Sequence, residues 1–346
     1  MQPVAQRYIG SPIKRSEDLR ILTGSGNYVD DVALPGMLHA AFVRSPIAHG
    51  RILSVDTSAA REVPGVAAVY TGEEMESLIV PGAYGMAAMM GGGGKPAFSM
   101  LCTDKVRLVG DPVALVVAES RYVAEDACEL IEVDYDPLRP IAGAEDALDP
   151  DSPPVFEDLG SNVLVRTDPV VYGDVEGAFA RADRVVRAHI SQHRHQNVPM
   201  EGRGTVADFD PTTGKLVVHA ATQGVHAVRN AMAARLGLDP EQVRVVAGDI
   251  GGSFGLKFGT SREEIAVAVA SKQLGRPVKW IEDRNENLTF SGQAREESFD
   301  VEMAVTDDGV ILGLKVDMTL DQGAYPGMGA MAVSYTHLTL PTNREV

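Results

Sequence analysis

Two stretches in the second half of the chain repeat one order of an apolar strand, a turn and a helix. Residues 216–221 predict a strand, and apolar residues at helical spacing predict a helix over 225–236 that Gly237 ends. Residues 243–250 and 262–274 repeat this order. Turns at strand ends are the usual place for ligand sites in α/β sheets, so we expect both turns to face a ligand.

The first half of the chain has a helix between two strands. Val113–Ala118 is a continuous apolar run typical of a buried strand, residues 121–130 have the period of a short amphipathic helix, and residues 131–135 alternate like a further strand. Together with the second half, this order of elements predicts an α/β (α+β) fold class.

The composition between these halves predicts a domain boundary. Residues 140–154 are rich in Ala, Asp and Pro and show neither helical nor strand period, which is typical of an exposed linker. We therefore expect one domain over 1–145, a linker over 146–160 and a second domain over 161–333. Within the first domain, residues 86–94 contain little that fixes a backbone and predict a mobile loop.

Composition and charge exclude several classes of protein. The chain has 346 residues, of which 45% are hydrophobic and 23% charged, as in an ordinary soluble globular protein. Its formal net charge of −17 argues against nucleic acid or an anionic membrane as a partner. No apolar run approaches the ~20 residues of a membrane span and the amino terminus shows no secretory pattern, so a cytoplasmic location is the default expectation.

Side chains that could bind a metal are sparse. The two cysteines, Cys102 and Cys128, form no C-x-x-C or other cluster, which excludes a disulfide framework and a four-cysteine iron–sulfur site within this chain. His193 and His195 would share one face of a strand, but no third strong ligand stands at a recognisable spacing. We therefore predict that no side chain of this chain ligates a metal.

The turn after the second predicted strand has the most informative sequence. Three glycines surround Phe254 in the segment VRVVAGDIGGSFGLK, residues 243–257, and a capping box from Ser261 to Glu264 opens the next helix. Residues without side chains let backbone N–H groups approach a ligand, and the helix end favours an anion. The pattern indicates an anionic cofactor, although a tight β-to-α turn without a ligand explains it equally well. Its spacing matches neither a Walker loop nor the dinucleotide motif G-x-G-x-x-G.

The segment from Gly248 to Lys257 resembles the glycine loop of the molybdenum-binding large subunits of the xanthine dehydrogenase, aldehyde oxidase and aerobic carbon monoxide dehydrogenase family. Other short segments follow in the family's order between Tyr8 and Tyr325. They are Gly24–Asp31, Leu34–Ala40, Arg44–His49, Val109–Ala114, Val123–Ala127, Glu132–Tyr135, Pro199–Glu201 and Arg276–Trp280. Each segment is short, but their common order identifies the chain as similar to this family.

The resemblance implies a hammerhead domain over 1–145 followed by the first part of a molybdopterin-binding domain over 161–333. Large subunits of the family are more than twice as long, so the chain is expected to be an amino-terminal fragment. Residues 334–346, SYTHLTLPTNREV, resemble nothing that the family places there. We expect this tail to be foreign.

The resemblance also implies a cofactor site. Gln223 matches the glutamine that donates a hydrogen bond toward an oxygen ligand of molybdenum, although a residue capping the start of a helix would have the same sequence context. The cofactor implied is molybdenum with molybdopterin cytosine dinucleotide. The residues expected to face its pterin and the oxygen ligands of the metal are Gly251, Gly252, Ser253, Phe254 and Gly255, and Phe254 is also expected to line a substrate channel.

Function follows from the same resemblance. The intact enzyme would oxidise carbon monoxide, an aldehyde or an N-heterocycle with water-derived oxygen and pass electrons to an iron–sulfur subunit with 2Fe–2S clusters and to an FAD-binding subunit, in a dimer of heterotrimers. The short segments look most like the carbon monoxide dehydrogenase type, and Phe258 stands where purine-oxidising members carry a glutamate. The general base lies beyond residue 346, so this chain alone is predicted to be inactive. The alternative is a non-catalytic cofactor-binding or assembly module.

Overall fold

The computed structural model describes residues 9–81, 99–164, 166, 168–294 and 296–325. The predicted loop over 86–94 and the predicted foreign tail over 334–346 lie outside these residues.

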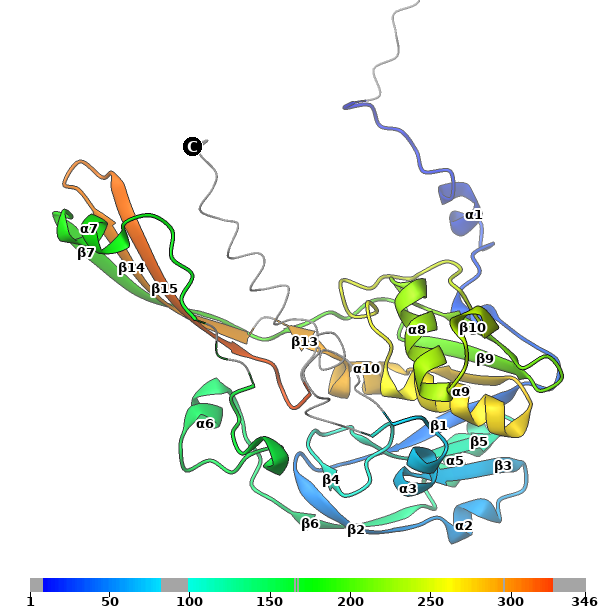
Figure 1. The fold of residues 1–346 in the computed structure, drawn as a ribbon. Coiled ribbons are helices and arrows are strands. Elements are labelled where there is room, and N and C mark those ends of the chain that lie inside the picture. The colour runs from blue at the N-terminus through cyan, green and yellow to red at the C-terminus, as the bar shows by residue number, and fades with distance from the viewer. Residues whose placement is uncertain (1–8, 82–98, 165, 167, 295, 326–346) are drawn as a thin grey trace, which may run out of the picture.

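A seven-stranded sheet forms the body of the molecule (Figure 1). Its strands in spatial order are β11 (Val243–Val246), β10 (Lys215–Ala220), β9 (Gly204–Asp210), β12 (Val278–Ile281), β1 (Leu38–Arg44), β5 (Pro112–Ala118) and β3 (Val66–Thr71). Leu38 of β1 pairs in parallel with Val278 of β12, so strands from both predicted domains join in one sheet. The division into 1–145 and 161–333 does not separate two sheets, and it stays a prediction.

Helices cover both faces of this sheet. Helix α9 (Arg262–Leu274) and helix α8 (Val225–Leu236) share one hydrophobic core with Leu115 and Val117, whereas helix α5 (Arg121–Cys128) shares another with the alternate residues of β5. Successive side chains of a strand point to opposite faces, so the two cores lie on opposite sides of the sheet. The predicted helices over 225–236 and 262–274 and the buried strand over 113–118 are therefore confirmed.

A smaller sheet joins β4 (Lys105–Val106), β2 (Gly50–Asp56) and β6 (Glu132–Pro137). The predicted strand, helix and strand of the first half are thus present, with the helix ending two residues early at Cys128. Their two strands nevertheless belong to different sheets, because β5 lies inside the large sheet while β6 pairs with β2.

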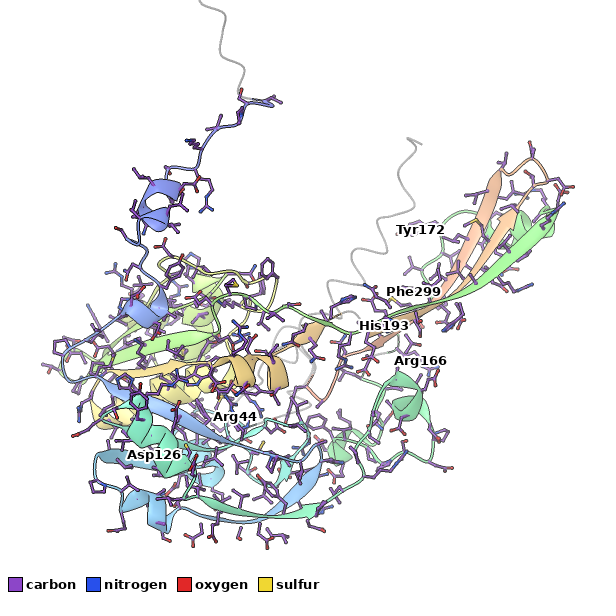
Figure 2. The ribbon with its side chains drawn as sticks, turned by 180° about the vertical axis from the view of Figure 1, so that it is seen from behind. Arg44, Asp126, Arg166, Tyr172, His193 and Phe299 are labelled. Atoms are coloured by element: carbon purple, nitrogen blue, oxygen red, sulfur yellow. The ribbon has the colours of Figure 1, made fainter. Side chains whose placement is uncertain are left out.

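A long three-stranded sheet extends away from the body, and we call it the arm (Figures 1 and 2). It contains β15 (Ile311–Asp321), β14 (Glu296–Val305) and β7 (Arg184–Gln192), with helix α7 (Val175–Ala180) against one end. In Figure 2, Phe299 lies on the arm and Arg44 lies in the body. A short pair of strands, β8 (His195–Gln196) and β13 (Gln293–Ala294), connects the two regions.

The predicted linker contains a short helix that no period in its sequence indicates, and its role as a linker stays a prediction. Residues 140–154 include helix α6 (Ala144–Leu148), although their sequence shows no helical period. The helix begins because the carboxylate of Asp146 accepts the backbone N–H of Ala142 at 3.0 Å and also pairs with Arg139 at 2.5 Å. The remaining short helices are α1 (Asp18–Leu22), η1 (Val29–Asp31), α2 (Ser58–Arg61), α3 (Gly72–Ser77), η2 (Glu157–Leu159), η3 (Pro240–Gln242) and α10 (Arg284–Phe290). In the part of the chain that the structure describes, no helix has the length and apolar character needed to cross a membrane.

Candidate functional site

Two turns at one edge of the large sheet form the candidate site. Strands β10 and β11 are parallel neighbours, with Leu216 opposite Val243. The turn after each strand therefore leaves the sheet at the same edge. This arrangement brings Gln223, from the first turn, against Ser253, from the second, although 30 residues separate them in sequence. The two turns that the sequence predicts at strand ends therefore lie together in the structure, while their role in binding a ligand stays a prediction.

Contact between Ser253 and Gln223 fixes the orientation of the glutamine amide. The Ser253 hydroxyl oxygen accepts the backbone N–H of Lys257 at 2.9 Å, and the hydroxyl also lies within hydrogen-bond distance of Oε1 of Gln223. Because the hydroxyl oxygen already accepts one bond, its own proton is free to be donated to Gln223. The NH₂ group of Gln223 donates to no residue that the structure describes, so this exposed side chain presents two N–H donors.

The backbone of the glycine loop adopts conformations that most residues avoid. Gly252 has φ +101° and Gly255 has φ +92°, both in the region that favours glycine. A side chain at Gly251 would place Cβ 2.5 Å from Cβ of Glu201. Phe254 has φ 55°, which makes it the one positive-φ residue other than glycine in the described parts of the chain. Strained backbone of this kind clusters at functional sites.

Four successive N–H groups of this loop are available to a ligand. The amides of Gly252, Ser253, Phe254 and Gly255 donate to no atom of the described residues, whereas Leu256, Lys257 and Phe258 all donate to the loop itself. Nothing lies within 4 Å of the position that a Cβ of Gly255 would occupy, and the Phe254 side chain is 74% exposed. Successive free backbone amides form a concavity that binds anions or negatively polarised oxygen atoms. The loop therefore fits a cofactor that carries phosphate or metal-bound oxygen.

The beginning of the loop is fixed by the amino-terminal segment. The Asp249 carboxylate accepts two hydrogen bonds of 2.6 Å from Arg20 and one of 2.7 Å from the backbone N–H of Asn27. These bonds, first that of Arg20, lower the pKa of Asp249 to about 2. The strand predicted over 243–250 ends earlier, at Val246, and this part of the prediction is wrong. A Cβ at Gly248 would lie 2.6 Å from the Asn27 carbonyl oxygen, so the approaching segment takes the place of a strand partner.

Lys257 and Glu201, which no sequence pattern singles out as a pair, hold the rest of the loop. Lys257 is completely buried, and its Nζ donates to Oε2 of Glu201 at 2.9 Å. The same oxygen accepts the backbone N–H of Gly251 at 2.8 Å, and the backbone N–H of Glu201 donates to the Gly251 carbonyl at 3.0 Å. Both residues stand in segments that carry the family resemblance, but no pattern in the sequence indicates that they pair.

Lys257 also joins the two turns through its backbone. Its carbonyl accepts the N–H of Gln223 at 3.0 Å and the hydroxyl of Thr222 at 3.1 Å, while its own N–H donates to Ser253. Burial lowers the pKa of the Lys257 ammonium, and the neighbouring carboxylate of Glu201 opposes this effect. The buried residue Lys257 therefore contacts both turns of the candidate site and also Glu201.

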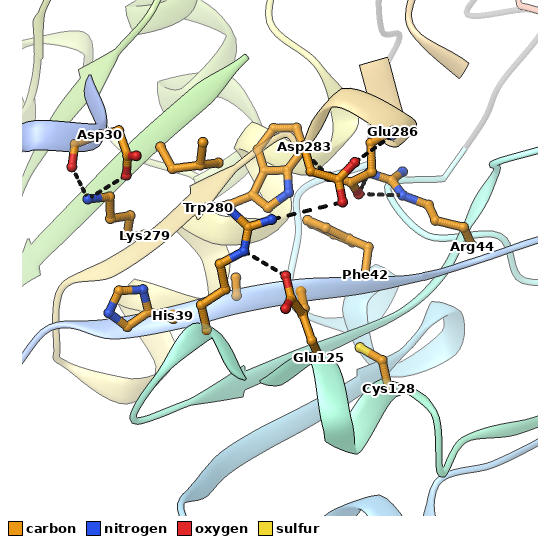
Figure 3. A pocket seen from close by; sticks show the side chains of 14 residues that line it. Asp30, His39, Phe42, Arg44, Glu125, Cys128, Lys279, Trp280, Asp283 and Glu286 are labelled. Carbon is orange, nitrogen blue, oxygen red and sulfur yellow. Dashed lines mark hydrogen bonds and ion pairs between the residues drawn. The ribbon is translucent and has the colours of Figure 1, made fainter. Parts of the chain in front are cut away.

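A separate cavity of about 390 Å³ lies between α5, β1 and β12 (Figure 3). Its lining includes Asp30, His39, Arg44, Arg121, Lys279, Trp280, Asp283 and Glu286. None of the predicted site residues lines it, and its cations are paired with carboxylates: Arg44 with Glu286 at 2.9 Å and Lys279 with Asp30 at 3.0 Å. The cavity is therefore distinct from the candidate site. Within the described residues, no group of three or more His, Cys, Asp or Glu side chains could hold a metal ion.

Comparison with known proteins identifies similar domains in the same order. Residues 23–139 match the model of the aldehyde oxidase and xanthine dehydrogenase a/b hammerhead domain, and residues 155–343 match that of the molybdopterin cofactor-binding domain. The predicted fold class, with these two domains in this order, is confirmed. The second match ends within the segment 334–346, whose foreign origin stays a prediction.

Individual relatives extend this comparison. The carbon monoxide dehydrogenase large chain of Hydrogenophaga pseudoflava is 40% identical over 321 residues, covering 89% of this chain and 39% of the relative. The nicotine 6-hydroxylase large subunit of Paenarthrobacter nicotinovorans is 40% identical over 332 residues, covering 93% and 39%. The crystal structure of quinoline 2-oxidoreductase from Pseudomonas putida 86 has a TM-score of 0.80 at 37% identity, covering 90% and 39%. The chain thus spans about 39% of the length of each of these proteins.

Proposed function

The chain belongs to the molybdopterin-binding large subunits of the xanthine dehydrogenase, aldehyde oxidase and aerobic carbon monoxide dehydrogenase family, and on this premise we propose that its two turns form one wall of a molybdenum hydroxylase active site. One observation supports this most: Gln223 contacts Ser253 in the glycine loop, and neither the NH₂ group of Gln223 nor the N–H groups of Gly252 to Gly255 donate to any described residue. Donors concentrated in this way are suited to the oxygen atoms of a bound cofactor and of its metal.

The residues of this chain act by binding and orienting. The bound cofactor supplies the two-electron oxidation of the substrate with oxygen derived from water. The Gln223 amide donates hydrogen bonds without titrating and without replacing a metal ligand. The loop from Gly251 to Gly255 presents the backbone N–H groups of Gly252 to Gly255 at close range, and the exposed ring of Phe254 narrows the approach of the substrate.

Substrate and partners are part of the same proposal. The names of the relatives refer to carbon monoxide, nicotine and quinoline, which supports a small substrate such as carbon monoxide, an aldehyde or an N-heterocycle. Phe258 offers no charge to a purine. The cofactor is the cytosine dinucleotide form of molybdopterin. With only two cysteines in the chain, electrons pass to 2Fe–2S clusters and FAD on separate subunits, in a cytoplasmic dimer of heterotrimers.

Replacing Gly252 by Val in the complete subunit with its partners tests this proposal. A Cβ at Gly252 would lie 3.2 Å from the Phe254 ring and 3.4 Å from Pro199, in a backbone conformation that a β-branched residue rarely adopts. We expect molybdenum and cytidine nucleotide contents to fall sharply while the fold persists. Gly259→Val is the matched control, because that position has no atom within 4 Å and no positive φ.

Equal cofactor content in both variants would favour the alternative, in which the loop is only a turn of a non-catalytic binding or assembly module.

A second expectation concerns the 346-residue chain alone. It should retain no molybdenum and oxidise neither carbon monoxide nor aldehydes, because the resemblance places the general base outside it, and a missing general base alone costs ~10²–10⁴ in rate. Elemental analysis and dye-linked assays of the purified chain measure both properties, and stoichiometric metal with turnover would refute this expectation.

A further inference from the structure

Lys257 is an unusual residue for the interior of this fold. Its side chain has no exposed surface, and among the largest fully buried side chains only Lys105 is another lysine. A buried ammonium is unfavourable unless it is paired, and buried ion pairs are often replaced by apolar residues without loss of stability. A contribution to stability is therefore a weak explanation for a buried Lys257. The groups that Lys257 and its partner Glu201 hold in place give a better explanation.

The pair with Glu201 holds the first glycine of the loop from two sides. Oε2 of Glu201 accepts both Nζ of Lys257 and the N–H of Gly251, and the backbone of Glu201 returns a bond to the Gly251 carbonyl. The other carboxylate oxygen, Oε1, is buried and has no hydrogen-bond partner among the described residues. Loss of the lysine charge would therefore leave the buried carboxylate with one backbone donor.

The backbone of Lys257 also holds the turn that contains Gln223. Gln223 is held by its N–H bond to the Lys257 carbonyl, and Ser253 is held by the bond from the Lys257 N–H. A displacement of Lys257 would move both partners of the contact that orients the Gln223 amide.

We propose that Lys257 and Glu201 are a positioning pair, which sets the distance between the Gln223 amide and the free N–H groups of the glycine loop. Both residues act through the backbone of the loop that they hold. The effect of this pair on catalysis rests on the proposed function. Its effect on the placement of the two turns can be measured without any cofactor.

Hydrogen exchange of the 346-residue chain tests the placement. The variants are Lys257→Met, Glu201→Gln and the double variant, with Lys105→Met as matched control, because Lys105 is 2% exposed and pairs with Glu157 away from the site. We expect exchange of the hydrogen-bonded amides at 223, 251 and 256–258 to rise at least about tenfold relative to the amides of β5 in Lys257→Met and Glu201→Gln. The double variant should add little, because both single changes break one interaction. Lys105→Met should leave this ratio unchanged.

The pH dependence separates positioning from general stabilisation. Burial lowers the pKa of Lys257 from 10.5 and the charge of Arg203 lowers it further, while Glu201 and Glu282 oppose this effect. In the wild-type chain the ammonium therefore loses its proton at a lower pH than a free lysine, and the pair weakens as pH rises. As pH rises from about 7 toward the ordinary lysine pKa of 10.5, the loop should lose protection relative to β5 in the wild type and in Lys105→Met, and show no further loss in Lys257→Met. Measuring the loop against β5 in one sample cancels the chemical effect of pH on exchange.

Two results would overturn the proposal. An equal rise of exchange in the loop and in β5 would show that the pair only stabilises the fold, and unchanged exchange in the loop would show that it holds nothing. Glu201→Gln decides the question if Lys257→Met fails to fold. Retained cofactor in Gly252→Val would refute the proposed function and leave these exchange results standing, so the two failures are distinguishable.

Discussion

The body and the arm contain similar strands and bury them differently. All seven residues of β5 are buried, because α9 covers one face of the large sheet and α5 covers the other. In the arm, Ala188, Val301 and Val316 lie side by side across three strands, yet Val316 is 52% exposed. What packs over a strand decides its burial, and the composition of the strand alone does not.

The two faces of the arm have opposite character. One carries the row described above together with Ile190 and Phe299, and the other carries ion pairs such as Arg187 with Glu302 at 2.5 Å. This alternation is typical of a sheet with one solvated face. The body, in contrast, places its charges inside: Arg44 pairs with Glu263 at 2.6 Å and with Glu286 at 2.9 Å under the ring of Phe290. The same kind of substitution should therefore change the unfolding free energy by different amounts in the body and in the arm.

The largest difference is expected for matched arginines. Arg44→Ala leaves the carboxylates of Glu263 and Glu286 buried without their common cation, which should cost about 3–5 kcal/mol of unfolding free energy. Arg187→Ala removes an exposed ion pair of the arm and should cost less than about 1 kcal/mol. Urea unfolding of both variants measures the two values. Similar values would show that the buried network contributes no more than a surface pair.

Acid should affect the body through Glu263. Burial raises the pKa of this carboxyl, but the charges of Arg44 and Arg262 outweigh that effect and bring the pKa to about 2, below the ordinary 4.5. Its contribution of about 3 kcal/mol should be complete above pH 4.5 and disappear as pH falls toward 2. Burial raises the pKa of Glu264 and Glu286, whose contributions have the opposite sign.

The difference in unfolding free energy between the wild type and Glu263→Gln separates the contribution of Glu263 from those of these neighbours. When urea unfolding is repeated at decreasing pH, this difference should stay nearly constant from about pH 6 to about pH 4.5 and then shrink toward about pH 3. A difference that stays constant over this range would mean that Glu263 titrates at an ordinary pKa.

Patterns along the sequence predicted the elements that are local. The period of apolar residues was sufficient for α8, α9 and β5, whereas the parallel pairing of β10 and β11 that brings Gln223 to the glycine loop is visible only in the structure. Pairings between distant residues have no such signal. Arg44 lies 219 residues from Glu263, and Lys257 lies 56 residues from Glu201. The sequence likewise gives no signal that both halves of the chain share one sheet, because β1 and β12 are far apart along the chain and pair only in the folded structure.

A matched pair of isoleucines compares packing in the two regions. Ile265 in α9 has no exposed surface, whereas Ile190 on the arm is 51% exposed. Ile265→Val should cost about 0.5–1.5 kcal/mol, because the closely packed core cannot collapse fully around the missing methylene. Ile190→Val should be neutral within about 0.5 kcal/mol. Equal losses in thermal or urea unfolding would mean that the arm face is covered in solution.

The smallest effect on stability is expected for a charge on the apolar face of the arm. Val316→Lys places an ammonium where half of the side chain already meets solvent, so the unfolding free energy should change by less than about 0.5 kcal/mol. Association should respond more strongly, because a contiguous exposed apolar face promotes contact between copies of a chain. Sedimentation of the 346-residue chain at several concentrations should show weaker self-association in Val316→Lys than in Lys315→Ala, a change on the charged face next to it. Equal association of the two variants, or a large loss of stability in Val316→Lys, would contradict the view that the arm leaves this face uncovered while the body covers both of its own.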